Sequence, residues 1–243
     1  MAKVAVIIPA AGAGKRFGGD VKKPFAQLDN RPVFIRSVEL FINRPDVCQV
    51  ILTVGPEDYD VVKEKYAANL MFMNIKLVKG GAERFISVRN ALSFVDETAD
   101  LVAIHDAVRP CVLDDWIDSV FEKAAKTGAA ILAAPLTGTI KHVTGDKIDK
   151  TVARAGLFEA QTPQVFAREL ILKAYANLAA DAQPTDDAEV VEKLGHAVAI
   201  VPSDRRNLKI TGPADLNLAG AILKSIARKP KAGPTHAFDE AQW

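Results

Sequence analysis

A stretch rich in glycine and lysine near the start of the chain has the residue types that bind phosphate. Residues 9–16 read Pro-Ala-Ala-Gly-Ala-Gly-Lys-Arg and directly follow an apolar run. Their small side chains let backbone N–H groups approach an anion closely. Lys15, Arg16, Lys22 and Lys23 all fall within nine residues. Together they could neutralise a nucleoside triphosphate, which carries roughly four negative charges.

The glycine spacing does not fit two well-known phosphate loops. The dinucleotide fingerprint needs a third glycine at the position of Phe17, and the Walker A loop needs Gly at Pro9 and Ser or Thr at Arg16. Two interpretations remain: a phosphate loop of another kind, which the glycine context favours, or a plain glycine turn in a solvated basic loop.

A second candidate follows the apolar run Leu101–Ile104. His105-Asp106-Ala107-Val108-Arg109-Pro110 comes where an open α/β sheet binds ligands, at the carboxyl end of a strand. Asp106 could hold a ribose hydroxyl or a magnesium ion. His105 is more typical of a structural histidine than of a base, and no His, Asp and Glu residues occur at zinc spacing.

Two weaker signals lie elsewhere. Gly80-Gly81 precedes a helical stretch in which Ser87 comes one turn further on, which suits close approach to a flat ligand such as a base, or only a turn. Lys209 lies inside a strand-like apolar run, so it either reaches solvent at a sheet edge or points into a site.

The elements that must position these residues alternate along the chain. Apolar runs predict strands, and amphipathic runs between them predict helices, so the fold class is α/β: a single Rossmann-like domain with a mostly parallel sheet covered by helices on both faces. The predicted strands are Val4–Ile8, Gln49–Val54, Ile75–Val78, Leu101–Ile104, Ala129–Ala134, Ala197–Val201 and Asn207–Ile210. The predicted helices begin at Pro32, Pro56, Glu83, Asp114, Ala167, Asp186 and Pro213.

One segment breaks the alternation. Residues 136–152 place β-branched residues between turn signals, which predicts a projecting hairpin, either a dimerisation arm or a surface excursion. We expect one domain over residues 1–228 and a mobile C-terminal tail over residues 229–243, where Lys, Pro and Gly dominate.

Composition narrows the class of protein. The 243 residues carry 31 Lys and Arg against 30 Asp and Glu, a net charge of +1, which gives no global attraction to nucleic acid or to a membrane surface. Two cysteines exclude a disulfide scaffold and indicate buried, reduced thiols in a cytoplasmic protein. No apolar run is long enough to span a bilayer.

Taken in order, these motifs resemble those of the cytidylyltransferases in the nucleotide-diphospho-sugar transferase superfamily, and most closely the family that acts on 2-C-methyl-D-erythritol 4-phosphate. The resemblance covers roughly residues 3 to 225. It is carried by residues 10–16, Lys23, Gly80–Arg84, His105–Pro110, Ala160–Gln164, Thr185-Asp186 and Asn207–Thr211. It implies transfer of CMP from CTP to a polyol phosphate with release of pyrophosphate. The implied cofactor is Mg²⁺, held mainly by the CTP phosphates, with Asp106 as a candidate protein ligand.

The same resemblance implies roles for individual residues. Those implied to be catalytic are Arg16, Lys23, Arg154 and Lys209. Those implied to bind CTP are Pro9, Ala10, Ala11, Gly12, Gly14, Gly81, Ala82, Ser87, Asp106 and Ala107. Those implied to bind the acceptor are Arg109, Thr139, Arg154, Thr185 and Lys209. The family's arm exchanges between two subunits, so the resemblance also implies a homodimer in which Thr139 and Arg154 serve the partner's site.

The chain departs from the family pattern in places, and other functions stay open. Ala82 stands where many members have Asp, and Lys22-Lys23-Pro24 replaces the usual Pro-Lys-Gln. Ribitol-5-phosphate cytidylyltransferases share nearly all of these motifs, so the acceptor is not settled. A non-catalytic nucleotide-binding protein and a hydride-transferring Rossmann enzyme are more distant alternatives.

Overall fold

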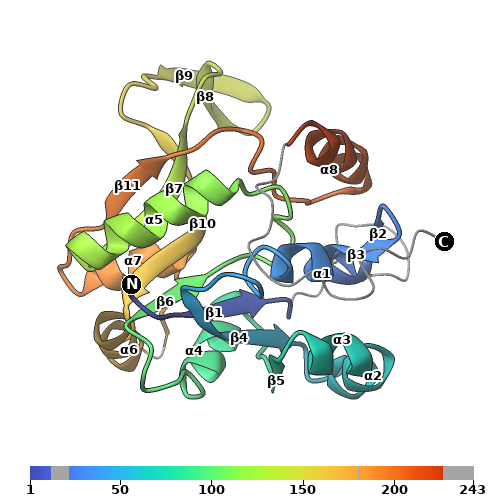
Figure 1. The fold of residues 1–243 in the computed structure, drawn as a ribbon. Helices are drawn as coiled ribbons and strands as arrows, with labels where there is room; N and C mark the ends of the chain where they lie inside the picture. Colours follow the sequence, from blue (N-terminus) through green and yellow to red (C-terminus); the bar gives the residue numbers. More distant parts are fainter. Residues whose placement is uncertain (12–21, 180, 227–243) are drawn as a thin grey trace.

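The structure is a computed structural model that describes residues 1–11, 22–179 and 181–226. Within these residues, seven strands form one sheet in the order β11-β7-β10-β6-β1-β4-β5 (Figure 1). They are β1 (Val4–Pro9), β4 (Val47–Val54), β5 (Ile75–Lys79), β6 (Leu101–Ile104), β7 (Ala129–Pro135), β10 (Phe158–Ala167) and β11 (Ala199–Pro202). Only β10 runs antiparallel to its neighbours in this sheet. The prediction of a mostly parallel sheet is confirmed.

Helices cover both faces of this sheet, as expected. α1 (Val33–Val38), α2 (Tyr59–Lys65), α3 (Ala67–Phe72) and α5 (Asp114–Thr127) pack on one face; α4 (Arg84–Leu92), α6 (Arg168–Ala176) and α7 (Asp187–Lys193) pack on the other. Alternate residues of β1 enter the two cores, Val4, Val6 and Ile8 in one and Ala5 and Ile7 in the other. A strand buried on both faces must be apolar throughout, which is why its sequence shows no alternation.

The longest described helix, α5, has clear sequence signals at both ends. Asp114 and Asp115 occupy its first turn, where negative charge stabilises the helix dipole. It ends at Gly128, whose φ of 81° is the left-handed conformation that glycine adopts at little cost.

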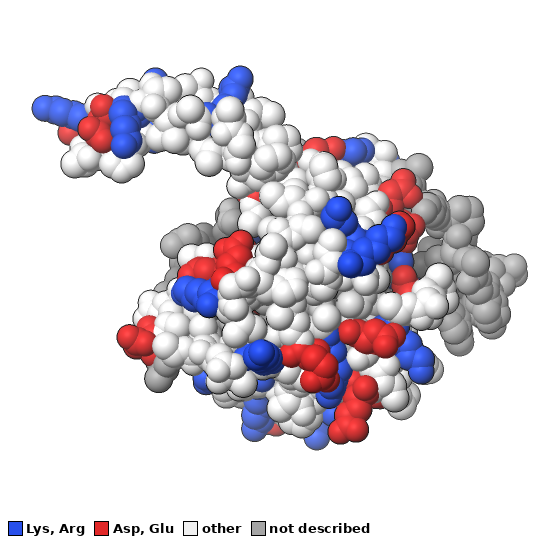
Figure 2. All heavy atoms as spheres, turned by 90° about the vertical axis from the view of Figure 1, so that its left-hand side faces the viewer, with Lys and Arg blue, Asp and Glu red and all other residues white. Residues whose placement is uncertain are grey.

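The predicted hairpin is present. β8 (Ile140–Thr144) and β9 (Lys147–Val152) form a separate antiparallel pair, and the turn between them contains Gly145 with a φ of 62°. Residues 141–151 are all exposed. The pair stands away from the body of the molecule, with charged side chains toward its tip (Figures 1 and 2).

A smaller core lies beside the main sheet. It joins α8 (Pro213–Ser225) to the segment that contains the 3₁₀ helix η1 (Lys23–Phe25) and the short strands β2 (Gln27–Leu28) and β3 (Arg31–Pro32). Its buried side chains are Ala26, Leu28, Val33, Cys111, Ile210 and Ala219.

Three expectations were wrong. No strand was predicted for residues 158–167, yet β10 lies inside the sheet. Asn207–Ile210 is not a strand: Ile210 N–H donates to the carbonyl of Val108 in a loop contact instead. Of the two cysteines, Cys111 is buried but Cys48 is exposed.

Several expectations concern residues that the structure does not describe. The tail 229–243 and most of the glycine loop, residues 12–21, are among them. In the described part of the chain, no helix is long and apolar enough to cross a membrane.

Candidate functional site

Three segments that follow strands meet at the carboxyl edge of the sheet. Ala107 N–H lies 3.4 Å from the carbonyl oxygen of Pro9, which joins the end of β6 to the end of β1. A Cβ added to Gly80, after β5, would lie 2.6 Å from the Cβ of Ala11, so only glycine permits this approach. This edge is where open α/β sheets bind nucleotides.

Ser87 shapes the backbone of the Gly80–Ala82 turn. Its hydroxyl accepts the Gly81 N–H at 3.0 Å and donates to the carbonyl of Glu83 at 3.1 Å. Ser87 is completely buried, whereas Ala82 is exposed. The backbone groups of this turn, rather than the Ser87 hydroxyl, are therefore the ones presented to a ligand.

The carboxylate of Asp106 is surrounded by three cations. Oδ2 lies 2.8 Å from Lys209 Nζ and 3.7 Å from Arg109 Nε, and Oδ1 lies 3.0 Å from Arg84 Nε. The Asp106 side chain is 8% exposed, but that of Lys209 is 42% exposed. Lys209 thus links a buried carboxylate to an open surface, where an anionic substrate can reach its ammonium group.

These charges decide the protonation state of Asp106. Burial by itself would raise its pKa, but the charges of Arg84, Lys209 and Arg109 outweigh burial and hold the pKa well below its usual range. Asp106 is therefore ionised at neutral pH, and two of its cations have further carboxylate partners, Asp187 for Arg84 and Glu159 for Arg109.

His105 has no free nitrogen for proton transfer. Nε2 lies 3.0 Å from the carbonyl of Arg109 and Nδ1 lies 3.1 Å from the hydroxyl of Thr162, and the ring is fully buried. Burial lowers its pKa to about 4. Its structural role, favoured from the sequence, fits this geometry.

A second carboxylate lies behind the cluster. Asp187, at the start of α7, is completely buried and lies 2.8 Å from Arg84 Nη2. Tyr175 donates its hydroxyl to Asp187 at 2.6 Å, and Gln164 of β10 accepts the Asp187 N–H at 3.0 Å. Arg84 therefore joins two carboxylates, and it connects the Gly80–Ala82 turn to Asp106.

Polar residues of β10 hold the loops around the site. The hydroxyl of Thr162 accepts the N–H of Asp106 at 3.0 Å, and its carbonyl accepts from the amide of Asn207 at 2.9 Å. Arg109 donates to the carbonyl of Asn207 at 2.7 Å. Asn207 is buried, so Lys209, two residues later, is brought to Asp106. Of the two interpretations of Lys209, the structure supports the one that points it into a site.

The site predicted from the sequence is only partly assembled within the described part of one chain. Arg109 and Lys209 both contact Asp106, and Pro9, Ala10, Ala11, Gly81, Ala82, Ser87 and Ala107 lie on the adjoining segments. Thr185 precedes Asp186, the N-cap of α7, and donates to Glu189 through its N–H (2.7 Å) and its hydroxyl (2.9 Å). Gly12, Gly14 and Arg16 lie outside the described residues.

The arm residues lie apart from this cluster. Thr139 and Arg154 are exposed, and Arg154 donates to the carbonyl of Thr137 at the base of the arm. Lys23, exposed in part, begins η1.

Sequence reasoning missed Arg84, Thr162, Gln164, Asp187 and Asn207 as residues that build the site. Arg84, Thr162, Gln164 and Asn207 stand in motifs that were noticed, but no role followed from them. Four of the five are buried polar groups with partners distant in sequence, and Arg84, 27% exposed, pairs with two distant carboxylates. Spacing along the chain does not reveal such partners.

The residues that could hold a metal ion are few. Among the described residues, no group of three His, Cys, Asp or Glu side chains could bind one. Asp106 is the carboxylate at the site, and its oxygens already contact cations. Such a site can bind Mg²⁺ only if the phosphate oxygens of a bound nucleotide and water molecules supply most of the ligands.

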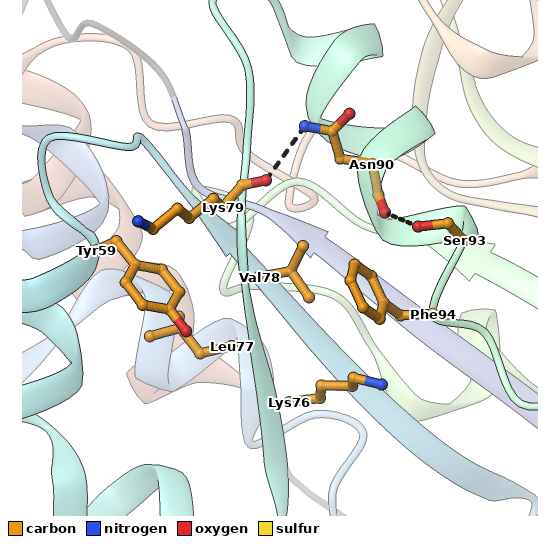
Figure 3. A pocket seen from close by; sticks show the side chains of 8 residues that line it. All are labelled: Tyr59, Lys76, Leu77, Val78, Lys79, Asn90, Ser93 and Phe94. Atoms are coloured by element: carbon orange, nitrogen blue, oxygen red, sulfur yellow. Dashed lines mark hydrogen bonds between the residues drawn. The ribbon is translucent and has the colours of Figure 1, made fainter.

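The described part of the surface also has a hollow at a place other than the Asp106 cluster. One cavity of about 480 Å³ lies along β5 and α4, where Lys76 Nζ is 4.5 Å from the centre of the Phe94 ring and Lys79 Nζ is 4.9 Å from that of Tyr59 (Figure 3). Lysines on an edge strand are typical of sheet edges that avoid pairing with other chains. Volume alone does not make this cavity the active site, because the convergent charged groups lie elsewhere.

A mostly parallel sheet covered by helices, with a charged cluster at the carboxyl edge of its strands, is the arrangement of an α/β protein that binds an anionic ligand such as a nucleotide. A sequence model of the family described as 2-C-methyl-D-erythritol 4-phosphate cytidylyltransferase matches residues 4–225. The chain belongs to this family and is therefore a cytidylyltransferase.

Comparisons with individual proteins support this family membership. The chain is 46% identical to the 2-C-methyl-D-erythritol 4-phosphate cytidylyltransferase of Rhodopirellula baltica over 233 residues, which cover 91% of this chain and 95% of the relative. It is 39% identical to that of Solibacter usitatus, covering 93% and 98%. Two solved structures are similar in fold: the 4-diphosphocytidyl-2C-methyl-D-erythritol synthase of Anaerococcus prevotii (TM-score 0.77, 28% identity, 92% and 96% covered) and the cytidylyltransferase of Thermus thermophilus (0.75, 30%, 90% and 98%).

Proposed function

We propose that this enzyme transfers CMP from CTP to 2-C-methyl-D-erythritol 4-phosphate, a step in isoprenoid precursor synthesis by the non-mevalonate pathway. The products are 4-diphosphocytidyl-2-C-methyl-D-erythritol and pyrophosphate. Family membership over residues 4–225 supports the reaction. We propose that the active site lies at the carboxyl edge of the sheet because Lys209 and Arg109 contact Asp106 there.

The chemistry needs positive charge rather than a general base. An oxygen of the acceptor phosphate attacks the α-phosphorus of CTP, the new P–O bond forms, and the bond to the β-phosphate breaks. A phosphate monoester has a second pKa of about 6, so it is largely dianionic at neutral pH and needs no deprotonation. The obstacle is the repulsion between two anions, which fixed cations reduce.

Four cations, Arg16, Lys23, Arg154 and Lys209, reduce this repulsion in our proposal. Arg16 and Lys23 act at the α-phosphate, and Arg154 and Lys209 position the acceptor phosphate, with Arg109, Thr139 and Thr185 nearby. Lys209 suits this role because its ammonium is exposed in part while Asp106 orients it.

On the nucleotide side, we assign the triphosphate to the segment 9–14, cytosine to the Gly81–Ala82 backbone shaped by Ser87, and the ribose to Asp106 and Ala107. Mg²⁺, which would supply further neutralisation of the triphosphate, would be held mainly by phosphate oxygens. Asp106 would be the protein group that reaches the coordination shell of this ion.

The arm supports the proposal of a homodimer. Four large apolar side chains on it or at its base are partly or largely exposed: Val143 (51%), Ile148 (65%), Leu157 (39%) and Phe158 (42%). Exposed apolar side chains on a projecting hairpin suit burial against a second copy of the chain. In such a dimer, Thr139 and Arg154 serve the partner's site.

Further parts of the proposal concern the surroundings of the enzyme. We place it in the cytoplasm, where CTP is available. We expect no association with nucleic acid or membranes, since a net charge of +1 creates no strong positive field that would attract either of these anionic partners.

One assay tests this proposal. Pyrophosphate release is measured with Mg-CTP and either methylerythritol 4-phosphate, ribitol 5-phosphate or no acceptor. Release with methylerythritol phosphate alone is expected. Release with ribitol phosphate alone would keep the reaction class and change the acceptor, and silence with all three despite CTP binding would make the protein a nucleotide receptor.

A further inference from the structure

Lys22 lies between two carboxylates of another segment. Its Nζ is 2.6 Å from Glu57 Oε1 and 2.6 Å from Asp58 Oδ2. Glu57 and Asp58 belong to the loop between β4 and α2. The Lys22 and Asp58 side chains are only 26% and 20% exposed, so the pair is shielded in part from water. Burial alone would lower the pKa of Lys22, but its hydrogen bonds to Asp58 and Glu57 outweigh burial and raise it.

The carboxylate loop is itself held in place. It follows β4, which pairs directly with β1, and Asp58 N–H donates to the carbonyl of Gly55 at 2.9 Å. A Cβ on Gly55 would lie 2.7 Å from the Glu57 carboxylate, so glycine lets this side chain fold back over the loop. The two partners of Lys22 thus lie in a short loop that is anchored at the end of β4.

Packing holds the other side of Lys23. Pro24 is buried, and Phe25 makes an edge contact with Phe34 (ring centres 5.7 Å apart) and stacks on Tyr66 (6.5 Å). Phe25 N–H also donates to the carbonyl of Lys22 at 2.9 Å. The backbone of Lys23 is therefore tied by aromatic packing after it and by the Lys22 ion pairs before it.

We propose that Glu57 and Asp58 are positioning residues for CTP binding: they hold Lys22, and through it they fix the backbone from which Lys23 reaches the nucleotide. This inference rests on the proposed role of Lys23. It gives Lys22 a different role from the one expected from the sequence, where it was counted among four cations that neutralise the triphosphate.

The two roles of Lys22 predict opposite effects when its carboxylates are removed. If Lys22 binds phosphate directly, Glu57 and Asp58 compete for its ammonium, and neutralising them tightens CTP binding. If Lys22 is a tether, neutralising them frees the segment and weakens CTP binding, because Lys23 is less well placed.

The test uses the double variant Glu57→Gln/Asp58→Asn and measures the Kd of Mg-CTP by calorimetry without acceptor. We expect Kd to rise about two- to fivefold, the size of effect that ion pairs near the surface typically have on an equilibrium. Under turnover, KM for CTP should rise by a similar factor, with kcat changed less. Lys22→Met should match this loss and add nothing to the double variant, while Lys22→Arg should restore most of the affinity.

The matched control is Glu122→Gln/Glu169→Gln. It also removes two carboxylates that are paired with basic side chains, Lys126 and Arg168, away from the site, and it should leave the Kd unchanged. A tighter or unchanged Kd in the Glu57/Asp58 variant would overturn the tether, as would an equal shift in the control. The calorimetric result stands even if no acceptor is turned over, so failure of this inference is distinct from failure of the proposed reaction.

Discussion

Asp106 and Lys209 form the contact on which the proposed acceptor site depends. The ammonium of Lys209 lies 2.8 Å from the carboxylate and its side chain is 42% exposed, so in our proposal Asp106 orients it while its remaining donors are available to the acceptor phosphate. Electrostatic donors of this kind typically change rates by a factor of about 10² to 10³.

We therefore expect Lys209→Met to lower kcat/KM for the acceptor by about 10²-fold. Lys209→Arg should recover part of the loss because it keeps the charge. The measurement is pyrophosphate release over a range of acceptor concentrations. Lys224→Met, an exposed lysine on α8, is the control. Wild-type kinetics in Lys209→Met would remove this residue from the site.

Arg84 supports a second prediction, on stability. Arg84→Met leaves the completely buried Asp187 without its cation, which costs about 3–5 kcal/mol of unfolding free energy. Adding Asp187→Asn should recover a large part of the loss, because the unpaired charge is removed while Tyr175 keeps a partner. Urea unfolding of both variants measures this; if the second substitution recovers nothing, the Arg84–Asp187 pair is not the source of the loss.

At the scale of single residues, the sequence was sufficient to predict the site residues that belong to short motifs. Asp106 and Arg109 follow an apolar strand, and Lys209 was notable as a charge in an apolar run. Arg84 and Asp187 were not predicted as a pair because they lie in separate helices that meet only after the sheet has formed. The ion pairs of Lys22 were not predicted for the same reason, since its carboxylates lie on a loop that the sequence could not place beside it.

At the scale of elements, the arm β8–β9 separates Arg154 from the Asp106 cluster. If arms exchange in a dimer, each site combines the body of one subunit with the arm of the other. Two inactive variants with defects on different parts can then complement each other.

We expect mixed dimers of Arg154→Met and Asp106→Asn to regain activity after the subunits are exchanged. One of two sites in each mixed dimer is intact, so random mixing should restore roughly a quarter of wild-type activity. The mixture is assayed by pyrophosphate release beside each variant alone. A mixture that stays as inactive as its components would show that each arm serves its own subunit.

The strand β10 shows where pattern reading failed among elements. Pro163 and three polar residues interrupt its apolar run, and proline is rare inside a sheet. The register of β10 against β7 shifts between Ala160 and Gln164, which accommodates this interruption. Its polar side chains form hydrogen bonds with the loops around the site. The residues that make the strand hard to predict from the sequence are therefore the ones that hold these loops in place.

For the whole molecule, the buried His105 makes stability depend on pH. Its pKa is about 4 in the folded state against 6.5 as the ordinary value, so the unfolded chain binds this proton first as the pH falls. The contribution of neutral His105 is fully present above about pH 6.5 and is lost as the pH falls toward 4, by about 3 kcal/mol in total.

Urea unfolding without nucleotide at pH values of about 7, 5.5 and 4.5 tests this dependence. The unfolding free energy of His105→Gln, which does not titrate, should fall less steeply over this range than that of the unmodified protein. His142→Gln, on the exposed arm, should keep the original slope. Equal slopes for His105→Gln and the unmodified protein would contradict the prediction.

The sequence by itself determined the α/β class, most strands of the sheet, the arm and the family, because these depend on local periodicity, turn residues and motifs in a fixed order. Only the tertiary structure decided which charges meet: that Lys209 and Arg84 share Asp106, that Arg84 also neutralises Asp187, and that Lys22 belongs to Glu57 and Asp58. The physical reason is that ion pairing depends on distance in space, and the sheet brings together loops that are far apart in the chain.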